Sequence, residues 1–143
     1  MTVKQISIFL ENRPESLMEL TEILAKRNIN MRALCLADTN DFGIARIIVD
    51  DPENVANILK EEEYIVKASN VIALEIPDET GSLNKILKIL GENGRNVEYM
   101  YGFTGRKTNC AFMVLRCTDI PKTEQVLESA GIRMLNQSEL REI

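Results

Sequence analysis

The 143-residue sequence contains one pattern twice, at an offset of 66 positions, and this duplication limits the folds that it can adopt. The segment ENRPESLMELTEILAKRNINMRAL, which starts at Glu11, aligns with PDETGSLNKILKILGENGRNVEYM, which starts at Pro77. Toward the end of each half the offset grows to 67 and then to 68, a drift that loops can absorb. We therefore expect each half to form one copy of the same small fold.

Both halves begin with the same succession of periodicities. Apolar runs at residues 6–10 and 71–76 predict a first strand, and a polar turn that holds Pro14 or Gly81 follows each run. The next segment predicts a helix, because its apolar residues recur with i, i+3, i+4, i+7 spacing, most regularly from Leu83 to Leu90. The two helices are expected to end near Asn28 and Gly94, since asparagine and glycine suit a left-handed C-cap.

The rest of each half completes the pattern. A second strand is expected to begin at Asn30 or Asn96, and a third to cover residues 43–49 or 110–116. A second helix opens at Pro52 or Pro121, because proline is tolerated in a first turn, and a last strand covers residues 64–67 or 132–135. The order is βαββαβ in both halves. This is the ferredoxin-like α+β arrangement, with helices on one face of an antiparallel sheet.

The repeat also predicts the domain organisation. We expect a first domain at residues 1–69 and a second at residues 70–143, with only Ser69 and Asn70 between two successive strands. Halves of about 70 residues bury small cores, so we expect them to be neighbours that rely on each other.

The composition argues against catalysis. The sequence has no histidine, which is the commonest general base near neutral pH and the commonest metal ligand. It also lacks the nucleophile-elbow motif G-x-S-x-G, the P-loop motif G-x-x-x-x-G-K-[ST] and the dinucleotide-binding motif G-x-G-x-x-G. We therefore expect that the protein is not an enzyme and that it has no catalytic residues, metal or cofactor. Cys35, Cys110 and Cys117 have no C-x-x-C spacing and fall in predicted strands, which favours buried reduced thiols.

Charge and hydropathy bear on the partners and the cellular location of the protein. The net charge is −5 and no run of basic residues is present, which argues against nucleic acid as a partner. No apolar stretch approaches the roughly 18 residues of a membrane span, and Glu11 comes too early for a signal peptide. We expect a cytoplasmic protein with no membrane partner.

The first turn and the helix after it identify a family. The segments NRPESLMELTEILAKRNINM and DETGSLNKILKILGENGRNV both resemble the ACT domain, whose opening reads roughly D-x-P-G-x-L, then a helix, then G-I-N-I. The resemblance covers both halves, up to about Asn136. It implies a free-standing tandem pair of small-molecule sensors, most often of amino acids, that regulate enzymes or regulators of amino-acid metabolism.

The turn before the helix can act as an amino-acid clamp. A helix N-terminus presents unpaired N–H groups and a positive dipole end, which suit a ligand carboxylate. Gly81 lets the backbone approach closely, and Thr80 and Ser82 add hydroxyl groups. In the alternative interpretation Gly81 only permits a positive φ and Ser82 only caps the helix.

Asn30 and Asn96 are the second element of the implied site. We expect them next to the turn after folding, where an amide can donate to a carboxylate and accept from an ammonium group. Alternatively, asparagine simply starts a strand after a tight turn. The resemblance implies the following ligand residues in the two halves: Asn12, Pro14, Glu15, Ser16, Leu17, Asn30 and Met31, then Asp78, Thr80, Gly81, Ser82, Leu83, Asn96 and Val97.

The two halves depart from the family pattern in different ways. Glu15 replaces the usual glycine and would repel a ligand carboxylate, whereas the second half keeps Gly81 but has Thr80 where proline is usual. Alternatively, Glu15 could hold the ligand's ammonium group in one composite site across a pseudo-symmetric interface. We expect fewer functional sites than repeats.

Tyr99, Tyr101 and Phe103 alternate along the second strand of the second half and so share one face. They form either a cross-strand or inter-domain packing row or one wall of the ligand pocket. Glu98, Met100 and Gly102 point the other way, so only one of the two sets can face the helices.

The charges near the two turns bear on the ligand. Glu11, Glu15, Asp78 and Glu79 surround them with Arg13 as the only nearby cation, so a polar or basic amino acid is favoured and aspartate and glutamate are disfavoured. In the opposing view these are solvated, screened loop charges.

Two further expectations concern partners. The alternative function is a ligand-free structural subunit that docks on a metabolic enzyme, and the chain is also expected to form a homodimer.

Overall fold

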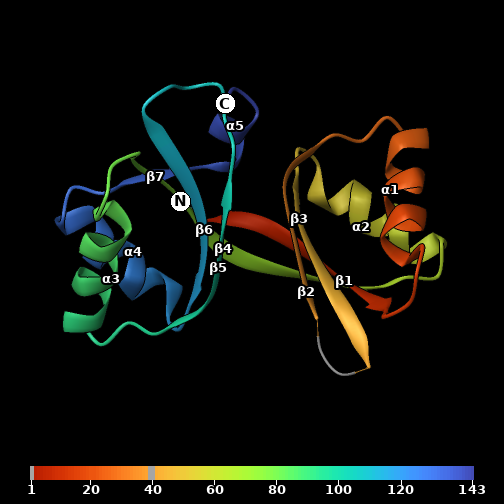
Figure 1. Cartoon of the computed structure of the whole chain (residues 1–143), viewed down its shortest axis with the longest axis horizontal. Coiled ribbons are helices and arrows are strands. Elements are labelled where there is room, and N and C mark those ends of the chain that lie inside the picture. The colour runs from red at the N-terminus through yellow and green to blue at the C-terminus, as the bar shows by residue number, and fades with distance from the viewer. Residues whose placement is uncertain (1, 39–40) are drawn as a thin grey trace. The chain divides into compact units, whose positions relative to one another are not determined.

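The computed structural model describes residues 2–38 and 41–143, which form two compact units (Figure 1). The first unit is Lys4–Ser69, and the second is built mainly from Asn70–Ile143. Each unit repeats the ferredoxin-like α+β pattern that the sequence predicts, an antiparallel sheet with two helices packed on one face.

The first unit follows the predicted order of elements. Its elements are β1 (Val3–Glu11), α1 (Ser16–Lys26), β2 (Met31–Asp38), β3 (Phe42–Val49), α2 (Pro52–Glu61) and the start of β4 (Ile65–Pro77). Strand β3 lies between β1 and β2 and is antiparallel to both. Alternate residues of β1, such as Ile6 and Ile8, point toward α1 and α2 and meet buried Leu20 and Leu59 in one core.

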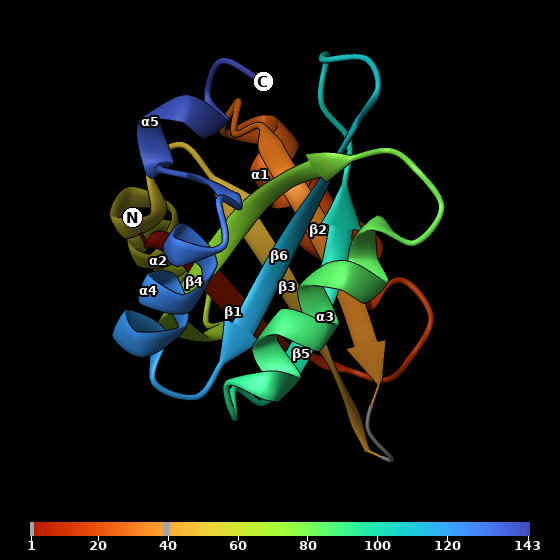
Figure 2. The ribbon, with the colours of Figure 1, turned by 90° about the vertical axis from the view of Figure 1, so that its left-hand side faces the viewer.

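The second unit repeats this arrangement and adds one short helix. Its elements are the rest of β4, then α3 (Ser82–Glu92), β5 (Val97–Phe103), β6 (Cys110–Cys117), α4 (Ile120–Ser129), β7 (Arg133–Leu135) and α5 (Gln137–Leu140). The strand order is β7-β4-β6-β5, antiparallel throughout. Figure 2 shows α3 and α4 lying over one face of this sheet, where Ile86 and Leu127 are buried against β4 and β6.

Strand β4 differs from the prediction of two strands separated by Ser69 and Asn70. It runs without a break over Ile65–Pro77, and the boundary between the two units falls inside it. The segment IVKASNVIALEIP has no glycine and no proline before its last residue, so nothing in its backbone interrupts the extended conformation. The polar side chains of Ser69 and Asn70 do not end the strand, because an extended backbone conformation does not require apolar side chains.

The helix ends confirm the predicted left-handed residues. Asn28 has φ 55° and Gly94 has φ 66°. The same pair of hydrogen bonds closes each helix end. After α1, the Asn28 N–H donates to the Ala25 carbonyl at 3.0 Å and the Ile29 N–H to the Leu24 carbonyl at 2.9 Å. After α3, the Gly94 N–H donates to the Gly91 carbonyl at 3.0 Å and the Arg95 N–H to the Leu90 carbonyl at 2.8 Å. This Schellman geometry satisfies carbonyls that a helix end otherwise leaves free.

Helix α5 is absent from the sequence-based prediction, although the sequence carries its signal. The Asn136 side chain accepts from the Glu139 N–H at 2.9 Å, and the Glu139 carboxylate accepts from the Asn136 N–H at 2.8 Å. This reciprocal capping box stabilises the start of a helix. The motif N-x-x-E at residues 136–139 could therefore have predicted it.

The aromatic row of β5 lies on the sheet face opposite α3 and α4. Met100 packs into the core beneath these helices, so its neighbours along the strand point the other way. On that other face Phe103 pairs with Phe112 of β6, with ring centroids 5.3 Å apart. For Phe103 the structure therefore supports the cross-strand packing interpretation.

The thiols are only partly as predicted. All three cysteines are free, but only Cys117 is buried, whereas Cys35 and Cys110 are partly exposed. Burial raises the pKa of the Cys117 thiol, and the nearby Glu98 carboxylate adds to the shift. Within residues 2–38 and 41–143, no helix is long and apolar enough to cross a membrane, and no group of histidine, cysteine or acidic side chains is placed to hold a metal ion.

Candidate functional site

The turns that precede α1 and α3 share an unusual backbone conformation. Glu15 has φ 73° and Gly81 has φ 91°, and each is the N-cap residue of the helix that follows. Neither helix has a side-chain cap hydrogen bond, so the interpretation of Ser82 as the cap of its helix is wrong. Gly81 does adopt the positive φ that the alternative interpretation assigned to it.

The first unit holds a cavity of about 460 Å³ beside its turn. The cavity lies between the end of β1, the start of α1 and the turn that joins α2 to β4. The lining residues are Phe9, Leu10, Glu11, Arg13, Ser16, Glu19, Glu62, Glu63, Tyr64 and Ile65.

Ser16 is the informative residue of this cavity wall. It is 8% exposed, and its Oγ has no hydrogen-bond partner within the part of the chain that the structure describes. A buried hydroxyl that lacks a partner is unfavourable and occurs in few places in a folded protein. The Ser16 hydroxyl is therefore available to a molecule that enters the cavity.

Arg13 forms the charged part of the cavity wall. Its Nε lies 2.9 Å from a Glu11 carboxylate oxygen, and a terminal guanidinium nitrogen lies 2.9 Å from a Glu19 oxygen. The hydrogen bonds that Arg13 donates to Glu19 and then to Glu11 raise the pKa of Arg13, so the group stays charged. With Glu62 and Glu63 nearby, the cavity offers one guanidinium group and several carboxylates.

An apolar cavity of about 380 Å³ adjoins the first one. Its lining residues are Phe9, Leu10, Glu11, Asp41, Phe42 and Ile65, and four of these residues also line the charged cavity. The Phe9 and Phe42 rings are tilted against each other, with centroids 5.8 Å apart. Phe42 is 40% exposed and Ile65 is 71% exposed, so this apolar surface is open to solvent.

The equivalent corner of the second unit is charged. Glu75 occupies the repeat position of Phe9, and Arg133 that of Ile65. The Lys107 ammonium lies 2.8 Å from one Glu75 oxygen, and the Arg133 guanidinium lies 3.4 Å from the other. Arg133 also reaches Glu139 of α5 at 3.3 Å, and these side chains border a smaller cavity of about 220 Å³.

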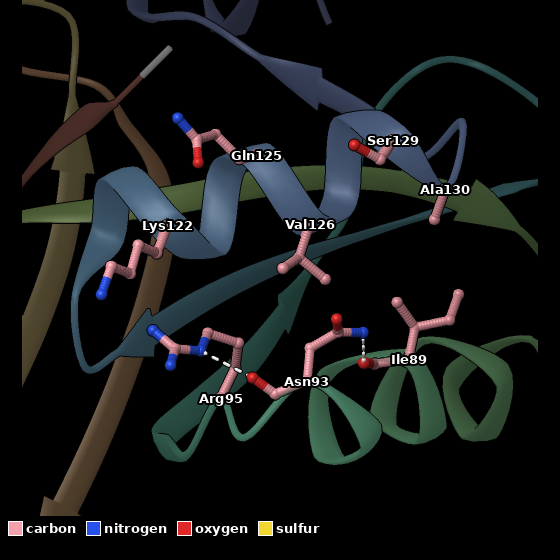
Figure 3. Close-up of a pocket in the computed structure, with 8 residues that line it drawn as sticks. All are labelled: Ile89, Asn93, Arg95, Lys122, Gln125, Val126, Ser129 and Ala130. Atoms are coloured by element: carbon pink, nitrogen blue, oxygen red, sulfur yellow. Dashed lines mark hydrogen bonds between the residues drawn. The ribbon is translucent and has the colours of Figure 1, made fainter.

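A third candidate is an open groove of about 530 Å³ between α3 and α4 (Figure 3). Two of its polar side chains, Asn93 and Arg95, already have structural roles. The Asn93 side-chain amide donates to the Ile89 carbonyl at 2.7 Å, and the Arg95 Nε donates to the Asn93 carbonyl at 3.1 Å, so both groups serve the carboxyl end of α3. None of the ligand residues predicted from the sequence lines this groove.

The strand register corrects one expectation about the predicted site. Glu11, which precedes the first turn, lies opposite Phe42, whereas Met31 lies opposite Val49 at the other end of β3. Asn30 and Met31 are thus at the opposite end of the sheet from residues 12–17. The register of the second unit does the same for Asn96 and Val97 relative to residues 78–83. The expectation that Asn30 and Asn96 lie next to the turn of their own half is therefore wrong.

Only Ser16 of the predicted first-half residues lines the charged cavity. Asn12, Pro14, Glu15 and Leu17 belong to the same turn or to the first turn of α1 but are not among its lining residues. The sequence-based prediction missed Glu19 and Tyr64, and assigned Arg13 only to the surrounding field. Burial raises the pKa of Tyr64, and the Glu19 carboxylate adds to this effect. The sequence did carry a signal for the Arg13–Glu19 ion pair, because these opposite charges lie on either side of a predicted helix start.

Comparisons with known proteins agree with this architecture. A protein-family model described as an ACT domain pair matches residues 1–143. Protein BT0572 from Bacteroides thetaiotaomicron has a similar crystal structure: the TM-score is 0.92 at 40% sequence identity, over 100% of this chain and 98% of that chain.

More distant structures show the same fold. The regulatory subunit of aspartate kinase from Thermus thermophilus, in its ligand-free form, gives a TM-score of 0.63 at 13% identity, over 89% of this chain and 91% of that one. The corresponding subunit from Thermus flavus gives a TM-score of 0.60 at 14% identity, over 89% and 91%. No curated protein matches the chain.

Proposed function

The chain belongs to the family of ACT domain pairs, and from this premise we propose that it binds a free amino acid and thereby regulates an enzyme or regulator of amino-acid metabolism. ACT domains are regulatory and not catalytic, so the ligand is a signal and not a substrate. The observation that carries the proposal is the buried, unpartnered Ser16 hydroxyl in a cavity that also holds the Arg13–Glu19 ion pair.

The proposed binding mode inserts the amino acid into this ion pair. The ligand carboxylate binds the Arg13 guanidinium and accepts a hydrogen bond from the Ser16 hydroxyl. The ligand ammonium binds the Glu19 carboxylate that Arg13 releases. Because the Arg13 and Glu19 side chains are 45% and 42% exposed, their own pair contributes little to stability and opens readily.

In this proposal the other predicted ligand residues do not contact the bound amino acid. Asn12, Pro14, Glu15 and Leu17 set the course of the first turn into α1. Asp78, Thr80, Gly81, Ser82 and Leu83 form the corresponding turn of the second unit. Asn30, Met31, Asn96 and Val97 lie at the far ends of their sheets, so they serve a ligand only when a different ACT domain supplies the turn.

The preference for a polar or basic ligand, proposed from the acidic turns, has mixed support. Glu11, Glu19, Glu62 and Glu63 line the charged cavity, which favours a cation. However, Glu11 and Glu19 are already paired with Arg13, and the ligand's own ammonium group takes the place of that cation. The ligand therefore does not need a second positive charge.

Thermal unfolding with each of the twenty amino acids tests the proposal. A ligand present at a hundredfold excess over its dissociation constant stabilises the folded chain by about 2.7 kcal/mol, which is a visible rise in Tm. We expect one amino acid or one chemical group of them to raise Tm. A flat panel would instead favour the alternative, a ligand-free interaction subunit that docks on a metabolic enzyme.

Matched serine variants locate the site. Ser16→Ala removes the unpartnered hydroxyl and is expected to weaken binding about tenfold, because a buried hydrogen bond to a charged ligand is lost. Ser82→Ala, at the equivalent position of the second unit, is the control and should leave this site unchanged. An equal effect of both variants would place the ligand elsewhere, and a loss of response on Gly81→Val would place it at the second turn.

A homodimer is a separate part of the proposal. Sedimentation with and without the bound amino acid tests it, because a dimer doubles the 16.2 kDa mass of the chain. A strict monomer under both conditions would overturn the dimer and leave the amino-acid site intact.

A further inference from the structure

The two adjoining cavities of the first unit point to the chemical class of the ligand side chain. Building on the proposed function, we propose that the first unit selects an amino acid with a large apolar side chain, such as leucine, methionine or phenylalanine. The charged cavity holds the ammonium and carboxylate groups, and Phe9, Phe42 and Ile65 form the side-chain subsite.

The first argument is that the two cavities adjoin each other and share four lining residues. Phe9, Leu10, Glu11 and Ile65 line both of them, so a molecule that fills the first cavity lies at the edge of the second. The volumes are about 460 Å³ and 380 Å³, which together leave ample room for one free amino acid. The arrangement is polar at one end and apolar at the other, as in an apolar amino acid.

The second argument is the exposed apolar surface itself. Phe42 and Ile65 are 40% and 71% exposed, and the partly buried Phe9 ring lies beside Phe42, with centroids 5.8 Å apart. A side chain that covers these three residues removes apolar surface from water on both partners. On the usual scale this gain makes leucine bind about 10- to 100-fold more tightly than alanine.

The charges at the rim do not favour a basic side chain over an apolar one. Glu11 and Asp41 also line the apolar cavity, but Glu11 is held by Arg13 at 2.9 Å. Asp41 is exposed, so an ion pair with it would remain in solvent and add little affinity. The stem of an arginine could lie on the Phe42 ring, and this is the competing outcome that the experiment separates.

The second unit provides an internal comparison. At the repeat positions of Phe9 and Ile65 it has Glu75 and Arg133, which pair with each other, and Glu75 also pairs with Lys107. An apolar side chain placed there would have to desolvate charged groups without replacing their partners, which is strongly unfavourable. We therefore expect one apolar amino-acid site per chain, in the first unit.

Titration calorimetry of the full chain tests the proposal with leucine, phenylalanine, alanine, arginine and glutamate. We expect leucine or phenylalanine to bind with a stoichiometry of one per chain, at least about tenfold more tightly than each of the other three. A tighter complex with arginine or glutamate, or two equal leucine sites per chain, would overturn the apolar assignment while keeping the amino-acid sensor. No binding of any amino acid would overturn the proposed function as well.

Variants in the apolar subsite locate the side chain. Ile65→Ser and Phe42→Ser remove apolar surface from exposed positions, so folding should survive, and leucine affinity should fall about tenfold while alanine affinity is unchanged. Leu36→Ser is the matched control, since Leu36 is a 52% exposed residue that lines neither cavity. Circular dichroism and Tm confirm that each variant is folded.

A second occupant of the same surface gives a different result. If a copy of the chain covers Phe42 and Ile65, Ile65→Ser will lower the sedimenting mass and leave the leucine affinity unchanged, which would overturn the subsite. A lower leucine affinity at an unchanged mass supports it.

Discussion

The first turns of the two repeats have the same backbone and opposite chemistry. Glu15 and Gly81 both adopt a left-handed conformation before their helices, at φ 73° and 91°. Six residues apart across each turn, the first unit has Arg13 and Glu19, whereas the second has Glu79 and Lys85, so the charges are exchanged. Duplication has preserved the backbone conformation of this turn while exchanging the charges on its two sides.

The difference shows which parts of a repeat are constrained by folding. The core positions stay apolar in both units, because each helix must bury one face against its sheet. The corner near the turn is not needed for that burial. One copy has an open apolar surface with Phe42, and the other has an ion-pair cluster around Glu75.

The largest expected effect tests whether the two cores are equivalent. Leu24 and Leu90 occupy the same repeat position and are each 1% exposed. Leu24→Ala and Leu90→Ala should each lower the free energy of unfolding by about 2–5 kcal/mol, because both leave a cavity in a core. Chemical denaturation measures both losses, and a loss in only one variant would show that one unit is far less tightly packed.

The next effect concerns the exchanged charges. Arg13→Gln removes the guanidinium that the proposal assigns to the ligand carboxylate, and the dissociation constant should rise about tenfold or more. Lys85→Gln removes the cation that the second unit carries at the repeat position of Glu19, and it is the matched control. Calorimetry gives both values, and equal losses would mean that the second unit binds the ligand as well.

Substitutions at the two left-handed residues are expected to change the stability of the chain in opposite directions. Gly81→Ala should destabilise the chain by about 1–2 kcal/mol through backbone strain alone, since no atom lies within 4 Å of the added Cβ. Glu15→Gly should stabilise the chain by a similar amount, of about 1 kcal/mol, because it relieves the same strain. Thermal and chemical unfolding measure both changes. Destabilisation by Glu15→Gly would show that the Glu15 side chain makes contacts that outweigh its strain.

The smallest expected effect separates the thiols of the two units. Burial raises the pKa of Cys117, so its protonated form adds stability that is complete below the thiol's unfolded pKa and lost as pH rises through its folded pKa. Unfolding measured between pH 8 and 10 should show this fall in the native sequence and less of it in Cys117→Ala. Partly exposed Cys35 should react with a thiol reagent in the folded chain, whereas Cys117 should react only after unfolding.

Much of each unit could be predicted from the sequence because the signals are local. The strand and helix order, the Schellman ends at Asn28 and Gly94, and the left-handed Gly81 each depend on a few adjacent residues. Where the pattern of one half is weak, the aligned segment of the other half indicates the position of the element. Glu15 shows the same logic, because it adopts the conformation that glycine adopts at the equivalent position.

The site required the tertiary structure, because its parts meet only through packing. Nothing near Arg13 in the sequence indicates that the turn from Glu62 to Ile65 would close one cavity with it. The separation of Asn30 from the first turn likewise depends on strand register, which long-range pairing determines. The sequence by itself determined the duplicated elements, since local backbone preferences and periodic burial suffice for them. The tertiary structure alone decided the unpartnered Ser16 hydroxyl and the adjoining charged and apolar cavities, since these depend on how distant segments pack.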